Sequence, residues 1–197
     1  MTDRLRNQIV ARLEESAAVK RATAAACSQV AFEAAEMIAG TLAAGGKLML
    51  CGNGGSAGDA QHIAAEFAAT LDHQRPRPGL AAMALTTDTS FITAYANDFG
   101  FEGVFARQVQ ALGKSGDVLL GISTSGTSKN VVAAVEAARN LGIKTIALTG
   151  STGGTLAGLC DILIAVPSDK TMHIQESHIA LGHVITETVE HLIAPDG

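Results

Sequence analysis

The chain has 197 residues, of which 47% are hydrophobic and 21 are glycine, and its formal net charge is −5. This length suits one domain with a substantial core and is short for two. The acidic balance lacks the basic excess that binding to a phosphate backbone requires, which excludes nucleic acid as a direct ligand. Cys27, Cys51 and Cys160 are an odd number, widely spaced and without a CxxC motif, which argues against a thiolate metal cluster and a disulfide framework.

The N-terminus shows no basic segment followed by an apolar one, as a secretory signal would. No apolar run reaches about 18 residues, the minimum for a membrane-spanning helix. We therefore expect a soluble, cytoplasmic protein with no membrane partner.

Residues 1–44 are predicted to be helical. They contain no proline and no glycine before Gly40, and Leu5, Ile9 and Leu13 recur at helical spacing ahead of an alanine-rich stretch. We expect one long helix or two consecutive helices. Because alanine-rich helices pack closely against partners, this segment is a candidate oligomerisation arm, attached to an α/β core at 45–197 within a single domain spanning 1–197.

From Lys47 onward, apolar runs alternate with helical stretches. The expected strands are 48–51, 81–85, 118–122, 144–148 and 162–166. The expected helices are 56–71, 89–96, 102–112, 128–141, a short one at 155–159, and 171–193. Most runs are continuously apolar, as in parallel strands buried on both faces, and the alternation predicts a doubly wound parallel five-stranded sheet flanked by helices. Ligands of such folds bind beyond the carboxyl ends of the strands.

A glycine-rich turn at 52–57, GNGGSA, follows the first strand and opens a helix, which makes it a candidate anion site. It also matches the loose dinucleotide pattern GxGxxG/A, but that fingerprint requires an acidic residue at the end of the second strand, about 20 residues on. Asp72 has this separation but precedes the proline loop at 73–79, and Asp88 comes 36 residues after Gly52. The context therefore argues against a dinucleotide.

A second turn at 123–128, STSGTS, lies between a strand and a helix and is rich in hydroxyl groups. A phosphate placed there would gain hydrogen bonds and the positive end of the helix dipole. Lys129, in the first helical turn, would suit a bound dianion. The simpler interpretation is a serine/threonine helix cap without a ligand, but the density of hydroxyl groups favours phosphate binding.

His62 and Glu66 lie four residues apart on the helix that follows the glycine-rich turn. Such spacing is usually that of a surface pair. Here the rest of the helix is mostly alanine and apolar residues, and it begins at the rim where ligands bind, so we expect both side chains to face a cleft. They could bind one divalent metal ion, or Glu66 could act as a base beside His62.

The last helix carries a polar cluster formed by His173, Gln175, Glu176, His178 and His183, for which a functional role is the favoured interpretation. Gln175 and His178 are i,i+3 neighbours. His183 lies about 12 Å further along the helix axis than Gln175, at about 1.5 Å per residue. Spacing alone therefore favours His178 over His183 as the partner of Gln175.

Six segments together resemble the sugar isomerase (SIS) domain family, and specifically its phosphoheptose isomerases: CGNGGSAGDAQHIAAE, LTTDTS, ANDFG, GDVLLGISTSGTS, ALTG and IQESHIALGH. The resemblance spans nearly the whole chain. It implies conversion of sedoheptulose 7-phosphate to D-glycero-D-manno-heptose 7-phosphate, through an enediol, for the biosynthesis of activated heptose. It also implies a homotetramer whose sites are built between subunits, so that the ligands need not all come from one chain.

The resemblance assigns roles to particular positions. Its metal ligands, for one zinc ion per subunit, correspond to His62, Glu66, Gln175 and His183. Its catalytic acid/base pair corresponds to Glu66 and His183, so that the family favours His183 where spacing favours His178. Its substrate contacts correspond to Asn53, Gly54, Gly55, Glu66, Asn97, Asp98, Ser123, Thr124, Ser125, Ser128 and Gln175.

The chain departs from the family pattern at three positions. Gly58 replaces an alanine, which destabilises the start of the helix by about 0.5–1 kcal/mol. Thr70 stands where many relatives have an arginine that faces the substrate, and Arg75 or Arg77 from the proline loop is a candidate replacement. His173 stands where lysine or arginine is common.

Two alternatives remain open at the level of sequence. One is a non-catalytic SIS protein that binds a phosphosugar or a protein partner and regulates. The other is an isomerase of another sugar phosphate, such as arabinose 5-phosphate or a hexulose phosphate. The presence of Glu66, Gln175 and His183 favours an enzyme over a regulator.

Overall fold

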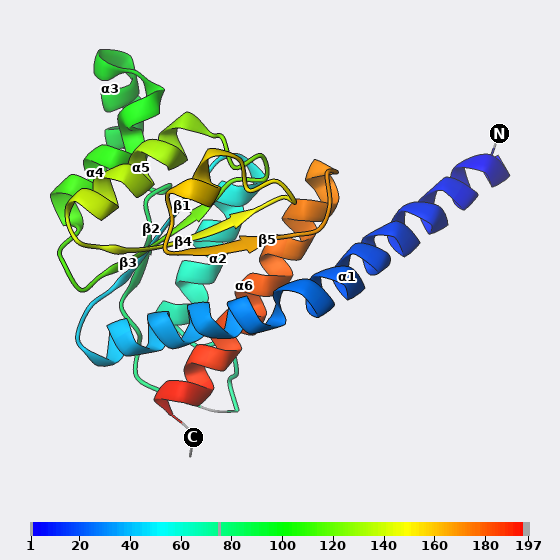
Figure 1. Cartoon of the computed structure of the whole chain (residues 1–197), viewed down its shortest axis with the longest axis horizontal. Coiled ribbons are helices and arrows are strands. Elements are labelled where there is room, and N and C mark those ends of the chain that lie inside the picture. The colour runs from blue at the N-terminus through cyan, green and yellow to red at the C-terminus, as the bar shows by residue number, and fades with distance from the viewer. Residues whose placement is uncertain (1, 75, 195–197) are drawn as a thin grey trace.

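Five parallel strands form the centre of the molecule, and helices cover both faces of the sheet (Figure 1). The computed structural model describes residues 2–74 and 76–194. In the order β2-β1-β3-β4-β5, the strands are β1 (Leu48–Gly52), β2 (Ala82–Ala84), β3 (Val118–Ile122), β4 (Lys144–Thr149) and β5 (Ile162–Ala165). The predicted doubly wound five-stranded sheet is confirmed.

The direction of winding reverses between β1 and β3. The chain runs from β1 to the edge strand β2 and then returns to place β3 on the other side of β1, where Gly52 pairs with Ile122 at the carboxyl ends. Ligands of open α/β sheets bind at such a switch point, in the crevice outside the carboxyl ends of the strands. The loops that leave β1 and β3 are the glycine-rich turn and the hydroxyl-rich turn.

Two helical layers enclose the sheet. One contains α1 (Thr2–Ala43), α2 (Gly55–Ala68) and α6 (Thr171–Ile193), and the other contains α4 (Val104–Leu112) and α5 (Lys129–Asn140). The strand side chains alternate between the two cores, so that Leu48 and Leu50 pack in the first layer and Met49 and Cys51 in the second. Burial on both faces explains the continuous apolar runs.

Several helix boundaries differ from the prediction. The predicted helix 102–112 is divided into a 3₁₀ turn, Phe101–Gly103, and α4, and the short helix near 155–159 is the 3₁₀ turn Gly154–Gly158. α3 (Thr89–Phe99) is three residues longer than predicted. It has no buried residue and projects from the body in Figure 1.

α2 ends at Ala68, whereas the sequence predicts a helix that reaches Leu71. The guanidinium of Arg77 donates to the carbonyl oxygens of Glu66 and Phe67, each at 2.9 Å. A side chain from the following loop thus satisfies the carbonyl groups at the end of the helix. No local pattern reveals this contact, because its donor lies about ten residues further along the chain.

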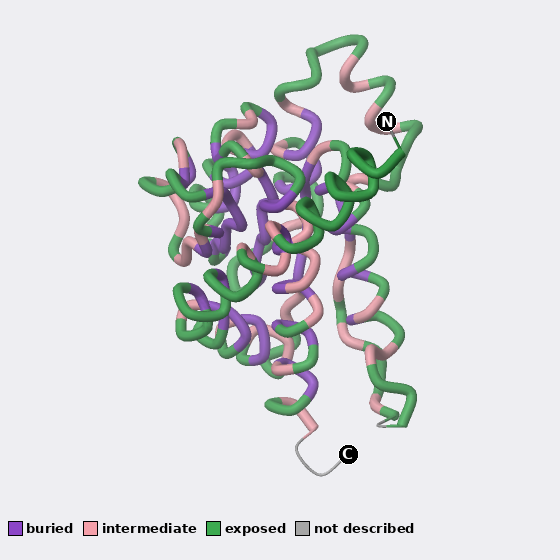
Figure 2. Tube along the Cα trace, turned by 90° about the vertical axis from the view of Figure 1, so that its right-hand side faces the viewer, coloured by how far each residue is buried: buried purple, intermediate pink, exposed green. Residues whose placement is uncertain are grey.

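α1 is a single helix of 42 residues, so the alternative of two consecutive helices is wrong. From Ser16 onward it packs on α6 and β5. Residues 2–14 are exposed, as the green turns near the N-terminus in Figure 2 show, and they extend beyond the body in Figure 1. In the described part of the chain, no helix combines the length and the apolar character needed to cross a membrane.

Candidate active site

Two side-chain amides join the turns at the switch point. Asn53, in the turn after β1, and Asn130, in the first turn of α5, each donate Nδ2 to the other's Oδ1 at 2.8 Å. Asn130 is buried. The pair holds the two turns together. Each amide has two N–H donors and an oxygen with two lone pairs, so Asn53 can still form hydrogen bonds to a ligand.

The hydroxyl groups of the second turn bond to one another. Ser123 Oγ lies 2.9 Å from Ser128 Oγ and 3.5 Å from Ser125 Oγ, and Thr127 Oγ1 donates to Ser125 Oγ at 3.0 Å. Ser128 is the N-cap residue of α5, but its side chain makes no cap hydrogen bond. The interpretation of Ser128 as a simple side-chain cap is therefore wrong, and a cluster of hydroxyl groups lies beside the N–H groups that open a 12-residue helix.

Lys129 is engaged outside this cluster. Its Nζ lies 2.7 Å from Glu102 Oε1, and both side chains are largely exposed. In this structure its ammonium group pairs with a carboxylate outside the turn, and a role of its charge toward a dianion bound in the turn stays a prediction.

α2 and α6 lie side by side and run in the same direction. Near their N-terminal ends the side chain of Gln175 lies against Gly55, and further along Gly182 meets Ile63. A Cβ atom added at Gly182 would lie 2.5 Å from Ile63 Cδ1, so a larger residue at this position would require the side chain of Ile63 to move. The approach brings the next residue of α6, His183, against α2.

His62, Glu66 and His183 form a compact cluster between the two helices. His62 Nε2 lies 2.8 Å from His183 Nε2 and 3.4 Å from Glu66 Oε1, and one atom from each residue lies within 4.8 Å of the others. The imidazole rings meet edge to face, with centroids 5.0 Å apart. The side chain of His62 is 49% exposed and that of Glu66 is 21% exposed, so solvent reaches the cluster. These groups can hold a divalent metal ion or transfer protons.

Gln175 contacts α2 about two turns before His183 does. Its Nε2 donates to both carboxylate oxygens of Asp59, at 2.7 and 2.9 Å, and Asp59 is buried. Burial raises the pKa of Asp59, while the hydrogen bond from Gln175 and the nearby His62 and His183 act to lower it. We did not predict Asp59, although its position three residues before His62 places it on the same helix face.

Comparisons with known proteins point to one family. The profile of the SIS domain family matches residues 13–150. The phosphoheptose isomerase of Roseiflexus sp. strain RS-1 is 50% identical over 192 residues, which cover 98% of this chain and 96% of the relative. Solved structures of phosphoheptose isomerases from Neisseria gonorrhoeae and Francisella tularensis are 45% and 40% identical, with TM-scores of 0.88 and 0.90. Each covers 94% of this chain, and the matches cover 98% and 97% of those chains.

The chain belongs to the phosphoheptose isomerase family of SIS domain proteins.

For the last helix, the pattern of the phosphoheptose isomerase family predicts His183 as the functional histidine, whereas helical spacing predicts His178. His178 is fully buried and its Nε2 donates to the carbonyl oxygen of Thr149 at 3.0 Å, so the spacing argument for His178 is wrong. His173 is also buried, within 3.3 Å of carboxylate oxygens of Glu15 and Glu176 where α6 meets α1. The predicted functional cluster of three histidines on this helix is therefore wrong, since two of them make structural contacts.

The buried His178 makes stability dependent on pH. Burial lowers its pKa from 6.5 to about 4, so below pH 6.5 the unfolded chain takes up a proton that the folded chain does not. We expect the free energy of unfolding to fall by up to about 3 kcal/mol between pH 6.5 and pH 4 from this residue alone. Urea unfolding at several pH values would measure the slope. His178→Gln, which keeps an N–H donor but does not titrate, should have a shallower slope, and an unchanged slope would contradict the assignment.

Two expected substrate contacts of the phosphoheptose isomerase family, Asn97 and Asp98, lie on the projecting helix α3. Both are exposed, and Asn97 Nδ2 donates to Asp98 Oδ1 at 2.9 Å. Within the described residues, neither side chain is hydrogen-bonded to the two turns or to the His62–Glu66–His183 cluster. Asn53 and Asn130 link the two turns of the switch point, and among the described residues no such hydrogen bond joins Asn97 or Asp98 to them.

The structure does not support Arg77 as the replacement for the arginine that many relatives have at the position of Thr70. Its side chain is buried (3% exposed), and its Nη2 lies 2.6 Å from Glu190 Oε1. Thr70 also lies near this oxygen, at 3.5 Å. Arg77 is therefore a structural residue, and Arg75 lies outside the described residues.

Proposed function

We propose that the chain converts sedoheptulose 7-phosphate to D-glycero-D-manno-heptose 7-phosphate, for the biosynthesis of activated heptose. The observation that carries this proposal is the cluster in which His62 Nε2 lies 2.8 Å from His183 Nε2 and 3.4 Å from Glu66 Oε1. Membership of the phosphoheptose isomerase family supports the substrate class. The cluster supplies the acid/base groups that moving a carbonyl group requires.

The phosphate and the sugar hydroxyl groups would bind at the two turns. The hydroxyl cluster beside the N-terminus of α5 is suited to a phosphate, because it offers side-chain donors together with the positive end of the helix dipole. A series of neighbouring residues leads from the hydroxyl cluster toward the His62–Glu66–His183 cluster: Asn130 bonds Asn53, Gly55 lies beside Gln175, and Gln175 bonds Asp59. The proposed substrate contacts are Asn53, Gly54, Gly55, Glu66, Asn97, Asp98, Ser123, Thr124, Ser125, Ser128 and Gln175.

The reaction moves the carbonyl group from C2 to C1. Glu66 would remove a proton from C1 of the ketose, and the electron pair of that C–H bond would form the double bond of an enediol. His183 would donate a proton to the oxygen on C2 and accept the proton of the oxygen on C1. Return of a proton to C2 then completes the aldose, so no oxidant or reductant is needed.

Zinc fits the donor set of the cluster. Two imidazole nitrogens and a carboxylate oxygen are common zinc ligands, and a tetrahedral ion spaces neighbouring ligand atoms by roughly 3.3 Å. The 3.4 Å between His62 and Glu66 matches this spacing, and the 2.8 Å between the two histidines requires a small widening. We propose His62, Glu66, Gln175 and His183 as ligands of one zinc ion per subunit. The ion would polarise the carbonyl group, although a ligating Glu66 would be a weaker base.

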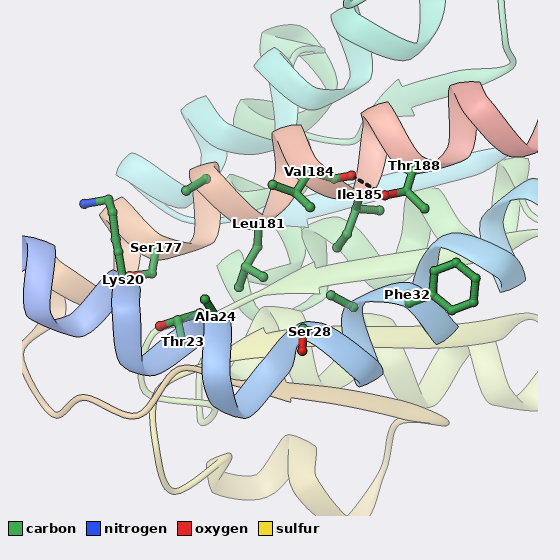
Figure 3. Close-up of a pocket in the computed structure, with 12 residues that line it drawn as sticks. Lys20, Thr23, Ala24, Ser28, Phe32, Ser177, Leu181, Val184, Ile185 and Thr188 are labelled. Atoms are coloured by element: carbon green, nitrogen blue, oxygen red, sulfur yellow. Dashed lines mark hydrogen bonds between the residues drawn. The ribbon is translucent and has the colours of Figure 1, made fainter.

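We propose that the enzyme is a homotetramer with sites between subunits. An apolar groove of about 350 Å³ lies between α1 and α6, lined by Phe32, Leu181, Val184 and Ile185 among others (Figure 3). The N-terminal turns of α1 carry the exposed Leu5, Ile9, Val10 and Leu13. Contact with further copies would cover these surfaces, with residues 1–44 as the oligomerisation segment of a single SIS domain spanning 1–197. It could also bring Asn97 and Asp98 of one copy to the site of another.

We place the enzyme in the cytoplasm. Cys27, Cys51 and Cys160 are free thiols, and the first two are buried. Reducing compartments keep thiols in this state.

Incubation of the purified protein with sedoheptulose 7-phosphate tests the proposal. We expect the aldose to form, and we expect turnover to fall at least tenfold after treatment with a chelator and to return when zinc is added. The product would be followed by anion-exchange chromatography. Binding of the ketose without any aldose would favour the regulator, and faster turnover of a shorter sugar phosphate would reassign the substrate.

A further inference from the structure

Asp59 holds the side-chain amide of Gln175 from the opposite helix. We infer that Asp59 is a positioning residue, which fixes the amide with Nε2 toward α2 and leaves Oε1 free to bind the metal ion. This inference rests on the metal site of the proposed function. It adds a residue to that site that is not itself a ligand.

The contact permits only one orientation of the amide. Nε2 lies 2.7 and 2.9 Å from the two carboxylate oxygens of Asp59. An ionised carboxylate accepts hydrogen bonds and donates none, so a reversed amide would set Oε1 against two oxygens at the same distances. Asp59 is only 6% exposed, which strengthens both the attraction in one orientation and the repulsion in the other.

The start of α2 also lies beside the stem of Gln175. A Cβ atom added at Gly55 would lie 3.4 Å from both Cγ and Cδ of Gln175, an ordinary van der Waals distance, so the start of α2 lies beside this side chain with room for about one methyl group between them. With Nε2 bound to Asp59, the remaining polar atom is Oε1, which has no hydrogen-bond partner among the described residues. An amide binds a metal ion through its oxygen, so the orientation decides whether Gln175 can serve as a ligand.

Asp59 could instead act only through its charge. It lies on the same face of α2 as His62, and its carboxyl group interacts electrostatically with both His62 and His183. A negative charge there would favour any cation in the cluster, whatever the orientation of Gln175. The two roles differ in one respect: the positioning role disappears when Gln175 has no amide, and the charge effect does not.

Zinc affinity of the purified full-length protein, measured by competition with a chromophoric chelator, separates these roles. Partners of metal ligands contribute about 10–100-fold in affinity, so we expect Asp59→Asn to weaken zinc binding by that factor. Gln175→Met should weaken it similarly, and the double variant should be no weaker than Gln175→Met alone. Asp161→Asn removes a carboxylate that bonds Thr145 at the opposite edge of the sheet, and it should leave affinity within twofold of the unsubstituted protein.

Asp59→Glu provides a second, charge-retaining test, which also applies if Asp59→Asn does not fold. It displaces the acceptor by one methylene group, so positioning predicts a loss of affinity and a pure charge effect predicts none. Unchanged affinity in Asp59→Asn or Asp59→Glu, or additive losses in the double variant, would overturn the inference. Absence of zinc binding by the unsubstituted protein would overturn it together with the metal site, while the isomerase assay would still report on the reaction. The melting temperature of each metal-free variant should match that of the unsubstituted protein.

Discussion

Replacing Glu66 with glutamine is expected to lower kcat/KM for the isomerisation by about 10²–10⁴-fold, while binding of the sugar phosphate is retained. Glutamine has nearly the shape of glutamate but cannot accept a proton from carbon. The 3.4 Å contact between His62 Nε2 and Glu66 Oε1 can persist in the variant as a contact with the amide. The loss should therefore appear in kcat rather than in the affinity measured by calorimetry.

A matched variant controls for the loss of one negative charge. Glu136→Gln removes a carboxylate from the exposed face of α5, and it should turn over substrate like the unsubstituted protein. If Glu66→Gln kept more than a tenth of the activity, Glu66 would not be the base. If both the unsubstituted protein and Glu66→Gln bound heptulose phosphates without isomerising them, the protein would be a regulator.

Replacing Arg77 with methionine is expected to destabilise the fold by about 3–5 kcal/mol, because it leaves Glu190 as a buried charge without its partner. Arg77 Nε and Nη2 both donate to Glu190 Oε1, at 2.8 and 2.6 Å, and the two side chains are 3% and 9% exposed. The substitution also removes the donors to the carbonyl oxygens of Glu66 and Phe67 at the end of α2. Urea unfolding at a fixed protein concentration would measure the effect.

An exposed ion pair is the control for this buried one. Lys129 and Glu102 lie 2.7 Å apart with side chains 77% and 67% exposed, so Lys129→Met should cost less than about 1 kcal/mol. The double variant Arg77→Met/Glu190→Leu should regain much of the lost stability, because no unpaired charge remains. A loss below 1 kcal/mol in Arg77→Met would mean that the pair is not buried in solution.

The order of the elements followed from local patterns. Apolar runs at β1, β3 and β4 are continuous because both faces of a parallel sheet are buried, and alternation with helices indicated the winding. The boundary of α2 did not follow, because Arg77 reaches it from a separate loop. The length of α1 as one helix did not follow either, since an alanine-rich pattern permits a break as readily as continuity.

The candidate site was predictable where a motif carries chemistry at helical spacing, as His62 and Glu66 do. Spacing within α6 was misleading for His183, because it considers one helix alone. The parallel course of α2 and α6, with Gly182 against Ile63, brings His183 to His62 although Gln175 lies about two turns away. Asp59 was not predicted, because its role depends on Gln175 of another helix. In the sequence alone it is indistinguishable from any polar residue near the start of a helix.

The amino-acid sequence by itself determined the winding of the sheet, the two candidate ligand-binding turns and the polar pair on α2, because these depend on periodicity and turn chemistry within short segments. Only the tertiary structure decided which histidine of α6 joins that pair, which arginine is structural and which carboxylate holds Gln175. Each of these depends on the approach of segments about 110–120 residues apart, and that approach is set by packing between helices rather than by the pattern of either one.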